Sequence, residues 1–281
     1  MVNGIINVYK EKGYTSFDVV AKLRGIFKQK KIGHTGTLDP DAEGVLPVCL
    51  GKATKVCELL TDKSKEYETV LMLGKITDTQ DMTGTVLEEH EVNVTEQEVR
   101  EIIHSFVGES RQVPPMYSAL KVNGQKLCDL ARAGKTVERQ PRPITIFSIE
   151  ILKIELPRVH MRVHCSKGTY IRTLCQDIGE KLGCGGCMEQ LLRTRVSEFS
   201  LSDAKKIGEI EELVHEYTEG VPPQEWNAAM FPFVSPVDAV FSQYSKAIVP
   251  DLYAKPLYNG NRIEPEMLLD FQTSMTEEPI R

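Results

Sequence analysis

Long hydrophobic runs are missing from this sequence of 281 residues. No apolar stretch approaches the ~18 residues that a membrane-spanning helix needs, and the longest candidate, residues 45–50, contains Pro47. Residues 1–12 also lack the basic start, apolar stretch and cleavage site of a secretion signal. The seven cysteines are an odd number without the spacing of a disulfide scaffold, which favours reduced thiols. We therefore expect a soluble, cytoplasmic protein.

Cofactor and nucleotide signatures are missing as well: there is no P-loop, no G-x-S-x-G elbow and no dinucleotide-binding glycine motif. Cys184 and Cys187 have the spacing of a zinc pair, but a structural zinc needs four ligands and the sequence offers no second pair. His160 and His164 fall in a predicted strand, where side chains four residues apart are separated by ~13 Å. The sequence therefore predicts an activity without a metal.

Basic charge is also scarce overall, because 34 Lys and Arg against 40 Asp and Glu leave a net charge of −6. Nucleic-acid binding normally leaves a basic footprint. The charge is uneven, however: residues 201–281 carry −8 and residues 1–200 carry +2. Within the latter, residues 19–38 contain no acid, and residues 111–143 have a local charge of +5. Such segments are usually solvated faces, but two in one chain indicate a polyanionic partner.

Hydrophobic periodicity predicts a mixture of strands and helices. Strands are expected at residues 4–8, 45–50, 67–73 and 158–165, the last with strict alternation of apolar and polar side chains. Helices are expected after Ser16, over residues 53–60, after the capping-box pair Thr95 and Glu98, and from the turn 166–169 to Leu182. The elements lack the regular spacing of a doubly wound parallel sheet, so we predict an α+β fold.

The segment 31–44 breaks this periodicity. Pro40 pushes Asp39 toward an extended conformation. Three glycines allow the backbone to approach a ligand closely: Gly33, Gly36 and Gly44. A carboxylate on such a loop, beside His34, is a candidate nucleophile or acid–base, and the alternative is a structural role in a turn or helix cap. The segment 81–85, Asp-Met-Thr-Gly-Thr, is interpreted as a turn because turns use these residue types.

Six motifs within residues 3–199 resemble those of the TruB-type tRNA pseudouridine synthases. They are KIGHTGTLDP at 31–40, GKATK at 51–55, KEY at 65–67, GKITDTQD at 74–81, PPMYSALK at 114–121 and CSKGTYIRT at 165–173. Their lengths and their order make a chance match negligible. The resemblance implies an isomerase that converts the T-loop uridine of tRNA, at position 55, to pseudouridine.

The resemblance also implies an architecture. It suggests a pseudouridine synthase fold, in which helices and loops flank a mixed, largely antiparallel central sheet. The catalytic domain is expected over residues 1–244, with a tRNA-binding insertion at about 111–143. Residues 245–281 are expected to form a small, PUA-like C-terminal module.

Carried over position by position, the resemblance makes Asp39 the catalytic aspartate, Tyr67 the aromatic that stacks on the target base and Arg172 the arginine paired with the aspartate. His34 is expected to contact the displaced loop, and Leu191 to line the base pocket. Further substrate contacts are expected from Gly36, Thr37, Lys12, Tyr170 and Lys121. Departures from the family pattern fall at Glu11, Cys128, Leu192 and Ser197.

The implied reaction breaks the N1–C1′ bond of uridine, turns the uracil and rejoins it through C5, so nothing is oxidised and no cofactor is required. Arg172 is expected to keep Asp39 ionised, because a cation within ~4–6 Å lowers the pKa of a carboxyl group. Tyr67 is expected to offset part of the cost of extruding the base by stacking, and its hydroxyl is a candidate acceptor for the released proton.

The expected partner is the T arm of tRNA, bound by a monomer without a protein partner. Two alternatives remain open on the sequence alone. One is a non-catalytic tRNA-binding protein or tRNA folding chaperone on the same fold, which needs only the basic surfaces. The other is a glycosidase, for which the sequence offers no acid partner to Asp39.

Overall fold

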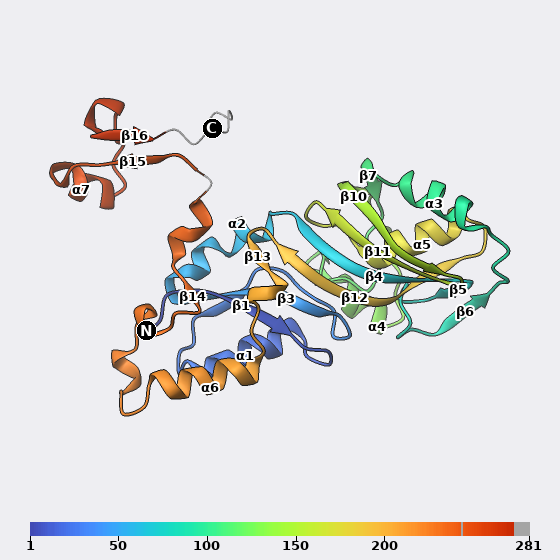
Figure 1. Ribbon diagram of the computed structural model, residues 1–281, viewed down its shortest axis with the longest axis horizontal. Coiled ribbons are helices and arrows are strands. Elements are labelled where there is room, and N and C mark those ends of the chain that lie inside the picture. Colours follow the sequence, from blue (N-terminus) through green and yellow to red (C-terminus); the bar gives the residue numbers. More distant parts are fainter. Residues whose placement is uncertain (243, 273–281) are drawn as a thin grey trace. The chain divides into compact units, whose positions relative to one another are not determined.

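The chain divides into two compact units, Met1–Ser235 and Pro236–Arg281, in a computed structural model that describes residues 1–242 and 244–272. The first unit contains a ten-stranded mixed sheet flanked by helices (Figure 1). This confirms the predicted α+β fold with its largely antiparallel sheet. The first unit ends at residue 235, earlier than the predicted domain boundary at residue 244.

The sheet follows the order β14-β1-β3-β12-β4-β11-β10-β7, with β2 paired to β3 and β13 paired to β12. Its strands are β1 (Gly4–Lys10), β2 (Ile32–His34), β3 (Glu43–Leu50), β4 (Lys65–Leu73), β7 (Gly108–Gln112), β10 (Arg142–Glu155), β11 (Arg158–Cys165), β12 (Gly186–Val196), β13 (Phe199–Ser200) and β14 (Val234–Ser235). The pair β3 and β12 is parallel, with Glu43 opposite Leu192 and Gly44 opposite Arg193. That junction places the loop before β3 beside the second half of β12.

Gly44 makes the parallel junction sterically possible. Its φ is +108°, and a Cβ atom at this position would lie 2.2 Å from the carbonyl oxygen of Arg193. Any larger residue would force β3 and β12 apart. The glycine predicted to permit close approach to a ligand therefore permits close approach of two strands.

Two hydrophobic cores lie against the sheet. In one, α1 (Ser16–Ile26) and α6 (Ile207–Tyr217) pack against each other and bury aliphatic side chains with β1 and β3. In the other, α3 (Glu96–His104) and α5 (Ile171–Lys181) pack on the strands from β4 to β10. The alternation predicted for 158–165 is confirmed in β11, whose Val159, Met161, Val163 and Cys165 are fully buried.

The helix starts follow local capping chemistry. The capping box of Thr95 and Glu98 is confirmed at the start of α3. In α1 the N-cap is Thr15, which forms a capping box with Asp18, and the prediction that Ser16 caps this helix is wrong. Ser16 is buried instead, and its Oγ accepts a hydrogen bond from the backbone N–H of Leu38 at 2.9 Å. The hydrogen bond of Ser16 thus joins α1 to the loop that carries Asp39.

The remaining elements are short. The first unit contains α2 (Cys57–Thr61), β5 (Lys75–Thr77), β6 (Val86–Glu89), β8 (Lys121–Val122), β9 (Gln125–Lys126) and α4 (Leu127–Arg132). In the second unit β15 (Lys246–Ile248) pairs with β16 (Asp270–Gln272), and α7 (Asp251–Tyr258) lies between them in sequence. Part of the predicted C-terminal module, residues 273–281, lies outside the described residues. No helix in the described part of the chain is long and apolar enough to cross a membrane.

Candidate active site

Asp39 lies on the loop between β2 and β3, and neighbouring backbone fixes this loop. The carbonyl of Pro40 accepts hydrogen bonds from the N–H of Gly13 at 2.8 Å and from the Nζ of Lys10 at 3.1 Å. The N–H of Ala42 donates to the carbonyl of Asp39 at 3.1 Å. The aspartate is therefore held by the end of β1 and the turn that follows it, as well as by its own loop.

Arg172, the second residue of α5, connects four separate segments at this site. Its Nε lies 3.0 Å from Oδ2 of Asp39, and its Nη2 donates to Oδ1 of Asp39 at 3.3 Å. Nη2 also donates to the carbonyl of Tyr117 at 2.7 Å, and Nη1 to the carbonyl of Thr79 at 3.1 Å. Only 5% of the arginine side chain is exposed, against 38% of Asp39. The guanidinium is thus fixed and presents its fork to a carboxylate that stays accessible.

Asp81 is the site residue that sequence reasoning missed. The turn interpretation of 81–85 is correct, since Oδ1 of Asp81 accepts hydrogen bonds from Thr79 Oγ1 and from the N–H and Oγ1 of Thr83. Its other oxygen, Oδ2, lies 3.7 Å from Nε of Arg172. Only its membership of the motif at 74–81 could have indicated this role. The turn therefore also supplies the arginine with a second carboxylate.

The ionisation of Asp39 is set by opposing influences. Burial raises the pKa of this carboxyl group above its ordinary value, and the charge of Asp81 raises it further. Arg172 is the strongest influence that lowers the pKa, with a smaller contribution from Lys10. The expectation that Arg172 favours the ionised form thus has a physical basis here, but burial outweighs it in the net direction.

Tyr67 and Leu191 lie beside this loop. Both contact one hydrophobic core that also contains Leu38 and Ala42, the apolar residues on either side of Asp39. Tyr67, on β4, is 9% exposed and lies directly opposite Arg193 on β12. Burial raises the pKa of Tyr67 to about 12, and Arg193 opposes that shift. Tyr67, Leu191 and the loop of Asp39 therefore contribute to one core, next to the adjacent strands β3, β12 and β4.

The sequence matches known families over most of its length. Residues 24–171 match the TruB family pseudouridylate synthase (N terminal domain), and residues 172–242 match the tRNA pseudouridylate synthase B C-terminal domain. The chain belongs to the TruB family of pseudouridylate synthases.

Proteins similar in sequence to this TruB-family chain match it over nearly its whole length. The tRNA pseudouridine synthase B of Lachnoclostridium phytofermentans is 58% identical over 270 residues, covering 93% of this chain and 84% of that protein. The protein of the same name from Alkaliphilus oremlandii is 48% identical, covering 96% of this chain and 85% of its own length. Among solved structures, the fold resembles a chain of a Cbf5-Nop10-Gar1 complex with a TM-score of 0.74 and 28% identity, over 96% of this chain and 70% of that one.

The other predicted substrate contacts fall into two groups. His34 ends β2 and is followed by Gly36 and the exposed Thr37 on the loop that carries Asp39. The N–H of Gly36 donates to Nδ1 of His34 at 3.4 Å, and burial lowers the pKa of this histidine. Tyr170 is the N-cap of α5, and burial raises its pKa. These four residues of the TruB-family chain flank the proposed catalytic groups.

Lys12 and Lys121 lie at the surface. Lys12 is 3.7 Å from Asp41 in an exposed ion pair, and Lys121 is exposed on β8. Lys10 is the lysine that meets the loop, and it is fully buried. Its Nζ donates to the carbonyls of Glu11 at 3.2 Å and Tyr14 at 2.6 Å, as well as to Pro40. Burial lowers the pKa of Lys10 to about 8.

The basic insertion 111–143 is closed at its base by two arginines. Arg111 donates to the carbonyl of Pro141 at 3.1 Å, and Arg139 donates to the carbonyl of Pro114 at 3.1 Å. Because the carbonyl of Tyr117 accepts a hydrogen bond from Arg172, the first part of the insertion is joined directly to this arginine.

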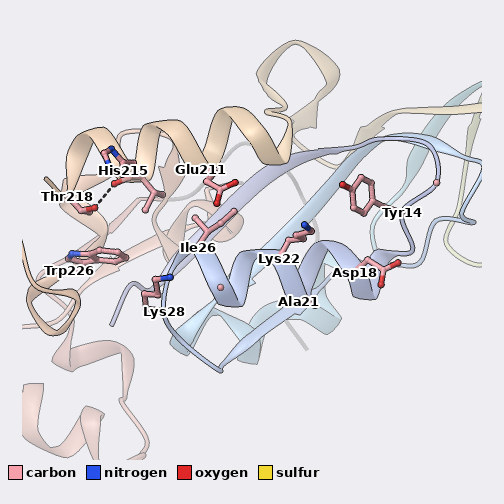
Figure 2. Close-up of a pocket in the computed structure, with 13 residues that line it drawn as sticks. Tyr14, Asp18, Ala21, Lys22, Ile26, Lys28, Glu211, His215, Thr218 and Trp226 are labelled. Carbon is pink, nitrogen blue, oxygen red and sulfur yellow. Dashed lines mark hydrogen bonds between the residues drawn. The ribbon is translucent and has the colours of Figure 1, made fainter.

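A groove of about 920 Å³ lies elsewhere in this unit, between α1 and α6 (Figure 2). Its lining includes the cations Lys22 and Lys28, the aromatics Tyr14 and Trp226, and Glu211. None of the predicted site residues lines it, so its size does not make it the reaction site. Among the described residues no group of three or more His, Cys, Asp or Glu side chains is arranged to hold a metal ion.

Proposed function

We propose that this chain converts a uridine of tRNA to pseudouridine, and that Asp39, Tyr67 and Arg172 carry the reaction. The observation that supports this most strongly is the fork of Arg172 on the accessible carboxylate of Asp39, in a chain of the TruB family. The preferred target is the T-loop uridine, position 55, in the T arm.

The reaction is an isomerisation in which every atom is accounted for. The N1–C1′ bond breaks, the uracil turns, a C5–C1′ bond forms, and the proton on C5 is exchanged for one on N1. Asp39 supplies the carboxylate that acts at this bond, and it must be ionised to do so. Burial raises the pKa of Asp39 and the paired Arg172 lowers it, so the arginine favours the charged form that the reaction needs.

Tyr67 and Leu191 bind the base in this proposal. The target uridine must leave the loop stack, at a cost of a few kcal/mol. Stacking of the base on an aromatic side chain offsets about 1–3 kcal/mol of this cost. Leu191, which packs against the core that contains Tyr67, supplies an apolar wall on the adjacent strand. The phenolate oxygen of Tyr67 then accepts the C5 proton.

We further propose that the insertion 111–143 and the cations of residues 19–38 hold the tRNA backbone. Both segments belong to the first unit, and the insertion is joined to Arg172 through Tyr117. RNA is recognised through its phosphates and loop shape, so a basic arm beside the reaction site suits this task. The chain is proposed to act as a cytoplasmic monomer, with residues 245–281 as a small PUA-like module.

Tritium release tests the function directly. The purified chain is incubated with a tRNA transcript labelled with [5-³H]uridine, and with the same transcript carrying cytidine in place of the T-loop uridine. We expect one equivalent of tritium from the first and none from the second. Release from both would contradict the T-loop assignment, and release from neither would contradict the function.

Neutralising the insertion should weaken tRNA binding in a salt-dependent way. Lys121, Lys126 and Lys135 are exposed on this segment. Changing all three to glutamine removes up to three phosphate contacts, so the slope of log K against log salt should fall by about 2–3. Filter binding between 50 and 300 mM salt measures this slope. Lys153→Gln, at a lysine paired with Glu155 outside both basic segments, is the control and should leave the slope unchanged.

A further inference from the structure

Arg193 brings a charge into the centre of the sheet without a counter-ion. Its side chain is 2% exposed, and its Nε donates to the carbonyl of Val45 at 2.7 Å. Within the described chain, Nη2 is buried without a hydrogen-bond partner and no carboxylate forms an ion pair with the guanidinium. Burying an unpaired charge is costly, so stability alone does not account for this arginine.

Strand register and two glycines fix the position of Arg193. It lies directly opposite Tyr67 on the neighbouring strand β4 and opposite Gly44 on β3. A Cβ atom added at Gly36 would lie 3.7 Å from Nη1 of Arg193, so the loop that carries Asp39 passes beside the guanidinium. The arginine therefore sits between the catalytic loop and the tyrosine.

The Tyr67 side chain lies next to this charge, because directly opposite residues of antiparallel strands project from the same face of the sheet. Burial lowers the pKa of Arg193, and the charge and hydrogen bonding of Tyr67 oppose that shift. In the other direction, Arg193 is the strongest influence that opposes the raised pKa of Tyr67. Cys165 on β11 and Asp39 on the loop act on Tyr67 in the opposite sense and raise its pKa.

The other buried cations nearby donate hydrogen bonds to backbone carbonyls. Lys10 donates to Glu11, Tyr14 and Pro40, while Lys65 donates to Thr61 and Lys63. Burial lowers the pKa of both lysines and of His34, and the charge of Arg193 lowers all three further, so Arg193 lies near each of them. Among these cations, Arg193 is the one whose charge acts most strongly on the phenol.

We propose that Arg193 is a positioning residue for the reaction, whose guanidinium holds the Tyr67 hydroxyl and stabilises the phenolate that takes the proton from C5. This inference rests on the proposed function. In the step, the phenolate oxygen bonds to the proton, the C5–H bond breaks, and its electron pair restores the C5–C6 double bond. Tyr67 is left as a neutral phenol, which returns the proton to solvent.

Single-turnover rates across pH 6–9.5 test the proposal with Arg193→Gln, Arg193→Lys and the control Arg195→Gln. Arg195 lies on the same strand, but it pairs with Glu66 at 3.3 Å and its side chain is 41% exposed. Loss of the guanidinium charge leaves less phenolate at a given pH, so Arg193→Gln should be slower by about 10²-fold at pH 7. Because the pKa of Tyr67 is already about 12 in the wild type, both rates should rise across this range, and the rate of Arg193→Gln should stay below the wild-type rate at every pH. Arg193→Lys should recover most of the rate, and tRNA affinity should change less than about threefold in all variants.

A direct titration of the Tyr67 hydroxyl distinguishes this role of Arg193 from a purely structural one. With 3-fluorotyrosine at position 67, ¹⁹F NMR titration should give a higher midpoint in Arg193→Gln than in the wild type or Arg193→Lys. An Arg193→Gln rate equal to the wild-type rate, or an unchanged midpoint, overturns the proposal. If the glutamine variant fails to fold, the lysine variant decides, and a folded lysine variant that loses rate while its ¹⁹F midpoint stays at the wild-type value contradicts the role. An inactive wild type would instead contradict the function.

Discussion

Replacing Asp39 by asparagine is expected to abolish pseudouridine formation, lowering the single-turnover rate by at least about 10⁴-fold. The amide has the shape of the carboxylate and still accepts a hydrogen bond from Arg172, so the loop should keep its position. What it lacks is the negative charge and the nucleophilic oxygen. Tritium release from [5-³H]uridine tRNA measures the loss, and tRNA affinity should change less than about threefold.

The matched control for this variant is Asp41→Asn. Asp41 lies two residues along the same loop, where it forms an exposed ion pair with Lys12 at 3.7 Å. This change removes one charge from the loop without touching Arg172, so the rate should stay close to the wild-type value. Release of tritium by Asp39→Asn at the wild-type rate would contradict the assignment of Asp39.

The same pair of variants separates the enzyme from the tRNA-binding alternative. A folding chaperone needs basic surfaces but has no use for an aspartate held by a buried arginine. If Asp39→Asn still binds and refolds tRNA without releasing tritium, the two activities are separable. The chaperone role, if present, then depends on the basic segments rather than on Asp39.

Local patterns in the sequence predicted the local structure well. The alternation over 158–165 corresponds to β11, because a strand with one buried face must alternate. The capping box at Thr95 likewise records the hydrogen bonds of the first helical turn of α3. Where two residues compete for one cap, as Thr15 and Ser16 do, the outcome depends on a distant partner, here Leu38.

Hydrophobic periodicity does not reveal which strands pair when they lie far apart in the sequence. Arg193 and Val45 are hydrogen-bonded across 148 positions of sequence, through the parallel junction of β3 and β12. Nothing in the residues around 193 indicates that this arginine is buried opposite Tyr67. Asp81 was missed for a different reason. Its hydrogen bonds within the turn already explain why an aspartate occurs at this position, so the sequence gives no sign of its additional contact with Arg172.

Arg172→Met should lower the single-turnover rate at pH 7 by about 10²–10³-fold. The change removes the strongest influence that lowers the pKa of Asp39, while burial and Asp81 continue to raise it. Less of the carboxylate is then ionised at neutral pH. The rate of the variant should therefore rise with pH over a range in which the wild-type rate is already constant, and tritium release from pH 5.5 to 9 measures this difference.

The pH dependence of the rate loss shows whether Arg172 acts on the ionisation or on the position of Asp39. Arg172→Lys keeps a positive charge but has no fork to bridge Asp39 with the carbonyls of Tyr117 and Thr79, so it should keep Asp39 ionised and misplace it. Its rate should fall without a shift in the pH profile, whereas Arg172→Met should show both effects. Arg162→Met is the control, because Arg162 pairs with Glu68 and Glu150 away from the loop. A pH-independent loss in Arg172→Met would mean that Asp39 is ionised without the arginine, and that Arg172 serves only to place it.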